Sequence, residues 1–114
     1  MTDCIFCKIA AGEIPAEVVY ENEDVLAFRD LNPQAPTHVL VIPRKHIETL
    51  HHAEHDDAEL MGKLFLGAQQ VAEVDGIVDS GYRTVMNCGA GAGQSVFHVH
   101  LHVLGGRSLG WPPG

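Results

Sequence analysis

The stretch FHVHLHVLGG, residues 97–106, places a histidine at every second position: His98, His100 and His102. On an extended strand alternate side chains point to the same face, with roughly 6.6 Å between neighbours on that face. The residues that alternate with the histidines are all apolar: Val99, Leu101 and Val103. The stretch therefore predicts a strand with one core face and one histidine face. A merely solvated face has no need of imidazole, so we expect the histidine face to carry a function.

Two kinds of chemistry fit three imidazoles on one face. Neutral imidazoles bind zinc, and a catalytic zinc would activate water. Alternatively, one histidine acts as a nucleophile or general base while its neighbours orient it and bind charge. Imidazole has a reference pKa of about 6.5, so it is largely neutral and nucleophilic at pH 7. The strand by itself is compatible with both.

The segment before the strand, CGAGAGQS (88–95), is rich in glycine. Glycines allow backbone N–H groups to turn toward an anion, and Gln94 and Ser95 add side-chain donors. The segment is not a P-loop, because no Gly-Lys-Ser/Thr follows and the next element is a strand. Next to three histidines, this loop favours a phosphate-binding site beside a nucleophile.

Hydrophobic patterning and helix breakers place the other elements. We expect a short helix, a hairpin, a strand, a main helix and a further strand before the histidine strand, at residues 4–11, 18–20 with 25–28, 37–42, 54–76 and 82–87. Asp56 and Glu59 are expected to form a capping box at the start of the main helix, and Gly76 to end it. The expected buried face of that helix consists of Leu60, Met61, Leu64, Phe65, Ala68, Val71 and Ala72. This order predicts an α+β fold with a mostly antiparallel sheet.

Composition and charge limit the classes of function. The chain has 114 residues, which predicts a single domain over 1–114, and its formal net charge of −8 argues against a nucleic-acid partner. No apolar run is long enough to span a membrane. Three cysteines without an export signal indicate a reducing compartment, so we expect a cytoplasmic protein.

The wider motif GQSVFHVHLHVLGG (93–106) resembles the histidine triad superfamily and, within it, the Hint branch of nucleotide-binding phosphoramidases. Further matching segments are IFCKIAAGEIPA (5–16), DLNPQAPTHVLVIPRKHI (30–47), GYRTVMN (81–87) and GGRSLGWPPG (105–114). The Trp-Pro-Pro-Gly ending favours Hint over the dinucleoside polyphosphate hydrolases. The resemblance covers essentially the whole chain. It implies a HIT-like fold with a five-stranded sheet, one main helix and a short N-terminal helix.

The resemblance also implies roles for individual residues. His100 would attack the α-phosphorus of a nucleoside phosphoramidate or acyl-nucleotide, and water would then hydrolyse the nucleotidyl-histidine. His102 would bind a phosphate oxygen, and His38 would join this network as a fourth histidine. His98 would orient the site, and Ser95 would donate a proton to the leaving amine. No cofactor is implied for this catalysis.

The substrate contacts implied by the resemblance have a polar and an apolar part. Asp30 would accept hydrogen bonds from the ribose hydroxyls, since a carboxylate is purely an acceptor. The polar contacts on the phosphate side are Asn87, Gly93, Gln94, Ser95 and His102. The apolar walls around a purine base are Ile5, Phe6, Ile9, Phe28, Leu31 and Val96. Family members are homodimers in which the segment carrying Trp111 approaches the partner's active site.

A second cluster begins with the Cys4-Ile5-Phe6-Cys7 motif. A redox function would need a thioredoxin-type βαβ context, which the pattern lacks. Similarity to zinc-binding histidine triad proteins and galactose-phosphate uridylyltransferases implies that His46 and His98 complete a site with the two cysteines. Two sulfur and two nitrogen ligands form a closed tetrahedral site, so the zinc would be structural. The alternative is that both cysteines are ordinary helix thiols.

The leading functional hypothesis is hydrolysis of purine nucleoside phosphoramidates, such as adenylated amines and adenylated lysine. Dinucleoside polyphosphate hydrolysis is the alternative within the same superfamily. A zinc-hydroxide hydrolase would instead use the triad as metal ligands. A fourth hypothesis is a non-catalytic AMP-binding or scaffolding protein.

Overall fold

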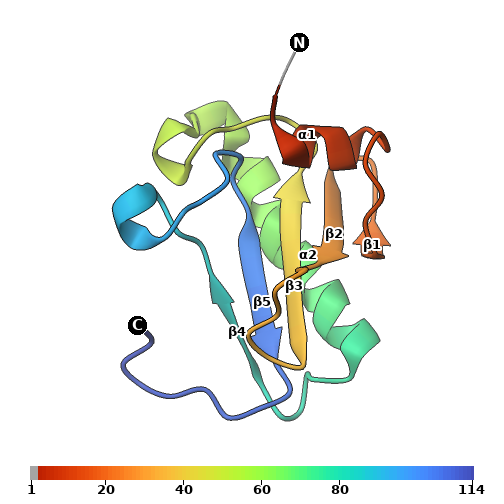
Figure 1. Cartoon of the computed structure of the whole chain (residues 1–114), viewed down its shortest axis with the longest axis vertical. Helices are drawn as coiled ribbons and strands as arrows, with labels where there is room; N and C mark the ends of the chain where they lie inside the picture. The colour runs from red at the N-terminus through yellow and green to blue at the C-terminus, as the bar shows by residue number, and fades with distance from the viewer. Residues whose placement is uncertain (1–2) are drawn as a thin grey trace.

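The computed structural model describes residues 3–114, and Figure 1 shows a five-stranded antiparallel sheet in the order β1-β2-β3-β5-β4. The strands are β1 (Val18–Glu21), β2 (Val25–Arg29), β3 (Thr37–Pro43), β4 (Tyr82–Val85) and β5 (Leu101–Gly105). The helices are the short α1 (Ile5–Ala10) and the main α2 (Ala58–Asp75). The predicted fold class, with its five strands and two helices, is confirmed. Within residues 3–114, no helix is long and apolar enough to cross a membrane.

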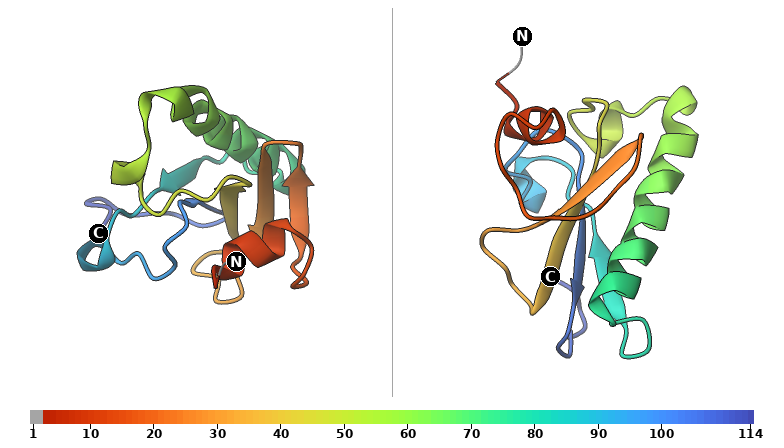
Figure 2. Two further views of the ribbon diagram at one scale, coloured as in Figure 1. Left: turned by 90° about the horizontal axis from the view of Figure 1, so that it is seen from above. Right: turned by 90° about the vertical axis from the view of Figure 1, so that its right-hand side faces the viewer.

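The two faces of the sheet are covered differently, as the right-hand view of Figure 2 shows. α2 runs along one face, where Val39 and Val41 of β3 are completely buried. α1 lies over one end of the opposite face, and its Phe6 packs in the same cluster as Leu40 and Ile42. β3 is therefore buried on both sides, which explains its continuous apolar sequence.

The start of α2 differs from the prediction. The capping box is formed by Glu54 and Asp57, and it begins a short 3₁₀ turn, His55–Asp57, before α2. Asp56 and Glu59 are not the pair, because it is the Asp57 carboxylate that accepts from the Glu54 backbone N–H at 2.9 Å. The predicted end is correct, since Gly76 follows the last helical residue with a left-handed φ of 67°.

One residue of the expected buried face of α2 was placed wrongly. Phe65 is 52% exposed, whereas Leu64 and Ala68 are buried against the sheet. The reason is the close approach of the helix at Gly67, where an added Cβ would lie 3.0 Å from Cγ1 of Val41. This contact turns the 64/67/68/71 side of α2 inward and leaves Phe65 at the surface.

The histidine strand is shorter than predicted, and so is the strand before it. β5 begins at Leu101 and β4 ends at Val85, so the strand expected over 82–87 stops two residues early. The chain before β5 bonds to a loop and not to a strand, because the Val99 N–H donates to the Ile47 carbonyl at 2.7 Å. The side-chain alternation persists through this segment, and Val99 and Leu101 share one core cluster.

Candidate active site

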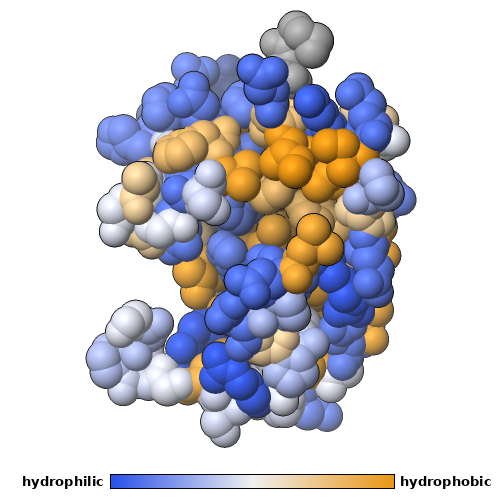
Figure 3. Space-filling model, in the orientation of Figure 1, coloured by the Kyte–Doolittle hydropathy of each residue, from blue (hydrophilic) through white to orange (hydrophobic). Residues whose placement is uncertain are grey.

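A pocket of about 270 Å³ opens beneath α1, on the sheet face opposite α2. Its polar lining consists of Glu17, Arg29, Asp30, Ser95, His100 and His102. Its apolar lining consists of Ile5, Phe6, Ile9, Ile14, Pro15, Ala16, Phe28, Leu31, Leu40 and Val96. Figure 3 shows apolar surface gathered around α1 on this face. The pocket therefore joins an apolar part to a pair of histidines, as expected of a small-molecule site.

Sequence reasoning missed part of this lining. The segment from Ile14 to Glu17, together with Arg29 and Leu40, was not among the expected contacts. The segment 14–17 reaches the pocket only because α1 folds across the sheet, and no local pattern announces that. Two expected wall residues, Ile5 and Leu31, line the pocket but are 47% and 101% exposed. A bound ligand would cover such exposed apolar walls.

The proton on His100 is fixed by its neighbour. Its Nδ1 lies 2.8 Å from the His98 carbonyl oxygen, so Nδ1–H donates and Nε2 keeps the lone pair. The ring is buried, and the edge-on ring of Phe6 packs against it with 5.1 Å between centroids. An imidazole held by this hydrogen bond offers Nε2 as a nucleophile or base.

His102 and His38 form a relay whose direction follows from the backbone. The Gln34 N–H donates to His38 Nδ1 at 3.0 Å, so the proton of His38 resides on Nε2. That Nε2 lies 2.9 Å from His102 Nδ1, which therefore accepts and leaves His102 Nε2 as a donor. Burial, with smaller effects from His100 and His38, lowers the pKa of His102 to about 4. Burial also lowers the pKa of His38, so both rings are neutral at pH 7.

Asp30 lies beside this relay. Its Oδ1 accepts from the Asn32 N–H at 2.8 Å, and its Oδ2 is 3.4 Å from His38 Nε2. Asp30, His38 and His102 are close enough to hold a metal ion. A metal on His38 Nε2 would, however, displace the proton while Nδ1 still accepts from Gln34, leaving an imidazolate. The hydrogen bonds of these three residues thus favour a proton relay over a metal ion held between them.

The glycine-rich loop is held by Gln94. The side chain of Gln94 is buried; its Oε1 accepts from the Gly89 N–H at 2.7 Å and its Nε2 donates to the Glu48 carbonyl at 2.8 Å. These bonds fix the loop, which presents Ser95 and Val96 to the pocket. The residues found lining the pocket do not include three expected phosphate-side contacts: Asn87, Gly93 and Gln94.

Trp111 likewise lies outside the pocket lining of this chain. Its ring is 83% exposed, and the Arg83 guanidinium carbon stands 5.9 Å from the ring centroid. The expectation for this residue concerned a partner chain.

The second predicted cluster, Cys4, Cys7, His46 and His98, comes together at the start of α1. Cys4 Sγ lies 3.3 Å from His98 Nδ1, and Cys7 Sγ lies 3.3 Å from His46 Nδ1. All four ligand atoms are within 4.8 Å of one another. His98 Nε2–H donates to the Pro43 carbonyl at 2.8 Å, which leaves Nδ1 as the lone pair facing the thiols. This donor set and its outer hydrogen bond fit a closed, tetrahedral zinc site.

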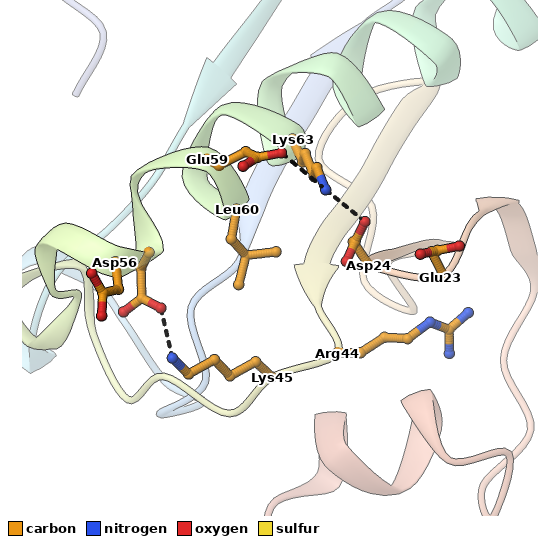
Figure 4. Close-up of a pocket in the computed structure, with 9 residues that line it drawn as sticks. Glu23, Asp24, Arg44, Lys45, Asp56, Glu59, Leu60 and Lys63 are labelled. Carbon is orange, nitrogen blue, oxygen red and sulfur yellow. Dashed lines mark hydrogen bonds and ion pairs between the residues drawn. The ribbon is translucent and has the colours of Figure 1, made fainter.

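A further hollow of about 450 Å³ is lined by charged side chains (Figure 4). Its lysines form ion pairs with aspartates: Lys45 Nζ lies 2.6 Å from Asp57, and Lys63 Nζ lies 2.8 Å from Asp24. The described lining of the hollow contains no histidine, cysteine or serine, and its one apolar residue is Leu60. We therefore assign the chemistry to the histidine pocket.

Known proteins with similar sequences and structures belong to one family. A model of the HIT domain matches residues 11–109. A HIT-like protein of Synechococcus elongatus is 52% identical over 112 residues, which are 98% of this chain and 97% of that protein. The crystal structure of a HIT family hydrolase from Legionella pneumophila is 54% identical, covers 98% of this chain and 100% of its own, and has a TM-score of 0.95. A histidine triad nucleotide-binding protein from Candida albicans is 33% identical, with coverages of 96% and 83% and a TM-score of 0.81.

Proposed function

Because this chain belongs to the HIT domain family, we propose that it is a nucleotide-binding hydrolase that cleaves the P–N bond of purine nucleoside phosphoramidates. One observation carries the proposal. The His98 carbonyl holds the Nδ1–H of His100 at 2.8 Å, so Nε2 is the free nucleophilic atom of a pocket-lining ring. The names of the similar proteins, a HIT family hydrolase and a nucleotide-binding protein, support the same class.

The reaction proceeds in two displacements. His100 Nε2 attacks the α-phosphorus, the P–N bond to the amine breaks, and Ser95 passes a proton to the leaving nitrogen. Water then attacks the same phosphorus and gives a proton back to Ser95, the P–Nε2 bond breaks, and a nucleoside monophosphate leaves with His100 and Ser95 restored. His102, a neutral donor through Nε2, stabilises the charge that develops on a phosphate oxygen.

The rest of the pocket suits a nucleoside. The apolar walls between α1 and β2, with Phe6 and Phe28 in edge-on contact at 5.4 Å, would enclose a base. Asp30 lies on the rim between these walls and the relay, where its carboxylate would accept from the ribose hydroxyls. Zinc would be held by Cys4, Cys7, His46 and His98, where it would cross-link α1 to the sheet without touching the phosphate. We further propose that the chain belongs to the Hint branch, on the basis of its Trp-Pro-Pro-Gly ending.

The proposal is tested by incubating the protein with adenosine 5′-phosphoramidate and measuring AMP. Wild type should release AMP, and His100→Ala should lower kcat by about 10³-fold or more, as expected for loss of a nucleophile. His55→Ala, at an exposed histidine outside the pocket, is the matched control. Mass spectrometry of the quenched reaction should find the nucleotidyl group on His100.

Other substrates decide between the hypotheses. Faster cleavage of a dinucleoside polyphosphate than of the phosphoramidate would identify the alternative hydrolase. If the protein binds AMP but cleaves neither substrate, the hypothesis of a non-catalytic AMP-binding protein would be supported. Equal AMP release by wild type and His100→Ala would refute the proposed nucleophile.

A further inference from the structure

The short helix α1 belongs to two sites at once. Cys4 and Cys7 direct their sulfurs to His46 and His98, at distances of 3.3–3.5 Å. Ile5, Phe6 and Ile9, which alternate with them along the same turns, line the nucleotide pocket. The six-residue helix and its N-cap residue Cys4 thus supply both the cysteine ligands and one wall of the pocket.

His98 is shared in a similar way. Its side chain offers Nδ1 to the thiols and donates through Nε2 to the Pro43 carbonyl at 2.8 Å. Its backbone carbonyl accepts the Nδ1–H of His100 at 2.8 Å. A ligand that fixes the His98 side chain therefore also fixes the atom that sets the tautomer of His100.

Phe6 connects the two sites through space. Its buried ring makes edge-on contacts with His98 and His100, with centroid distances of 6.0 and 5.1 Å. On another side it meets Phe28, a pocket wall, at 5.4 Å. A movement of α1 would therefore displace Phe6 and change its contacts with His98, His100 and Phe28 together.

A helix of six residues is too short to be stable by itself, so its position depends on what it is tied to. One tie is the Arg44 guanidinium, which donates to the Ala10 carbonyl at 3.0 Å. A metal held by Cys4, Cys7, His46 and His98 would tie the other end of α1 to the sheet. We propose that metal binding at these residues and nucleotide binding in the pocket are positively coupled, each strengthening the other. This inference rests on the proposed function, because it takes a nucleotide as the pocket ligand.

Coupling of this kind is reciprocal. If zinc raises the affinity for AMP by some factor, AMP must raise the affinity for zinc by the same factor. Couplings through a shared element typically amount to about 5- to 150-fold. We expect a factor of about ten, since the metal orders a wall and an orienting carbonyl but contributes no contact to the nucleotide.

The experiment uses the whole chain under reducing conditions, loaded with zinc or stripped by a chelator. Titration calorimetry gives the Kd of AMP for each form, and competition with a chromophoric chelator gives the Kd of zinc with and without saturating AMP. We expect AMP to bind about tenfold more tightly to the zinc form, with the same factor in the zinc titration. Amide hydrogen exchange in residues 5–11 should slow when either ligand binds.

Two cysteine variants separate the metal site from general thiol effects. Cys7→Ser removes a ligand and should give the AMP affinity of the stripped protein, with no response to added zinc. Cys88→Ser alters an exposed cysteine outside both sites. This variant should show the same tenfold difference in AMP affinity between its zinc-loaded and stripped forms as the wild type. Should Cys7→Ser fail to fold, the two zinc titrations of the wild type still measure the coupling.

The outcomes distinguish this inference from the proposed function. If AMP binds equally tightly to the zinc-loaded and stripped protein, or if zinc does not bind, the coupling is refuted and the nucleotide site stands. If AMP binds neither form, the proposed function falls as well.

Discussion

The histidines differ in which nitrogen carries the proton, and backbone carbonyls decide it. His98 donates through Nε2 to the Pro43 carbonyl and presents Nδ1 to the thiols. His100, two residues later, donates through Nδ1 to the His98 carbonyl and keeps its lone pair on Nε2. Two identical side chains thus acquire opposite tautomers, one suited to holding a metal and the other to attacking phosphorus.

Burial of His102 should make the free energy of unfolding depend on pH. Its folded-state pKa is about 4, whereas the unfolded chain titrates near 6.5. Between about pH 6.5 and 4 the unfolded state binds a proton that the folded state does not, so the free energy of unfolding falls as the pH is lowered through this window. Urea unfolding of wild type and His102→Gln should show a shallower decline in the variant. An NMR titration that gave His102 a midpoint near 6.5 would contradict this prediction.

The hydrogen bond from His38 to His102 predicts that substitutions of His38 lower kcat by different amounts. His38→Leu removes the donor to His102 Nδ1, now 2.9 Å away, so His102 loses its fixed tautomer. We expect kcat for the phosphoramidate to drop by about 10- to 100-fold, as for other outer hydrogen-bond partners. His38→Gln retains an N–H donor and should recover part of the loss. Equal rates for both variants and wild type would show that the relay has no role in catalysis.

Among the elements, α2 owes its position to contacts at both ends. Near its start, buried Asp57 links the capping box to Lys45, one residue before the metal-ligand position His46. At its end, Asp75 accepts from Arg29 on β2 and from Thr37 on β3. The helix thereby fixes the ends of the strands that carry the pocket, although it lies on the opposite face of the sheet.

Two glycines of α2 should respond oppositely to alanine. Gly62 is an exposed helical residue with nothing within 4 Å of an added Cβ, so Gly62→Ala should stabilise the protein by about 1 kcal/mol. Gly76 has equal space but a φ of 67°, so Gly76→Ala should destabilise it by about 1 kcal/mol through backbone strain. Thermal or urea unfolding measures both, and changes of the same sign would contradict the assignment of the helix end.

The network at the end of α2 should be sensitive to acid. Asp75 accepts two bonds of 2.9 Å from Arg29 and one of 2.7 Å from Thr37, and chiefly the Arg29 bond lowers the pKa of Asp75. Asp75→Ala should cost about 1–3 kcal/mol at pH 7. Because the folded pKa is depressed, this contribution is present above about pH 4 and disappears as the pH falls through the folded value. Glu59→Ala, at an exposed pair 3.6 Å from Lys63, is the control and should change little.

For the whole molecule, several large apolar side chains are exposed outside the pocket. Exposed apolar side chains lie on α2, at Phe65, and in or before the edge strand β4, at Tyr82 and Val78. Such a surface beside a sheet edge is typical of an interface. We propose that a second copy of the chain covers it, in line with the homodimer that the resemblance implies.

Sedimentation equilibrium tests the dimer. Wild type should have twice the chain mass of 12.3 kDa, because burial of this surface stabilises association. Phe65→Ser, at a position 52% exposed, should shift the equilibrium toward monomer. Leu50→Ser, at a position 47% exposed outside α2, should leave it unchanged. A wild-type mass of one chain at high concentration would refute the dimer.

Much of the architecture could be predicted because it follows from local patterns. The continuous apolar run 37–42 placed β3 at the centre of the sheet, and the alternation in 97–103 placed Val99 and Leu101 in the core. Side-chain direction along an extended chain is set by covalent geometry, so spacing alone reveals which residues share a face. The spacing of His98, His100 and His102 likewise predicts that they share a face, but it does not predict which groups they meet.

Other features depended on residues far apart in the sequence. The capping box moved to Glu54 and Asp57, whose carboxylate also meets Lys45, and β5 started late because Val99 bonds to Ile47. The wall from Ile14 to Glu17 joined the pocket only when α1 crossed the sheet.

The sequence by itself determined that three histidines face one way beside a glycine-rich loop. Only the tertiary structure decided what each one does, because the carbonyl that His98 meets belongs to Pro43 and the N–H that fixes His38 belongs to Gln34. A tautomer is set by the group that the other ring nitrogen meets, and folding brings that group into place.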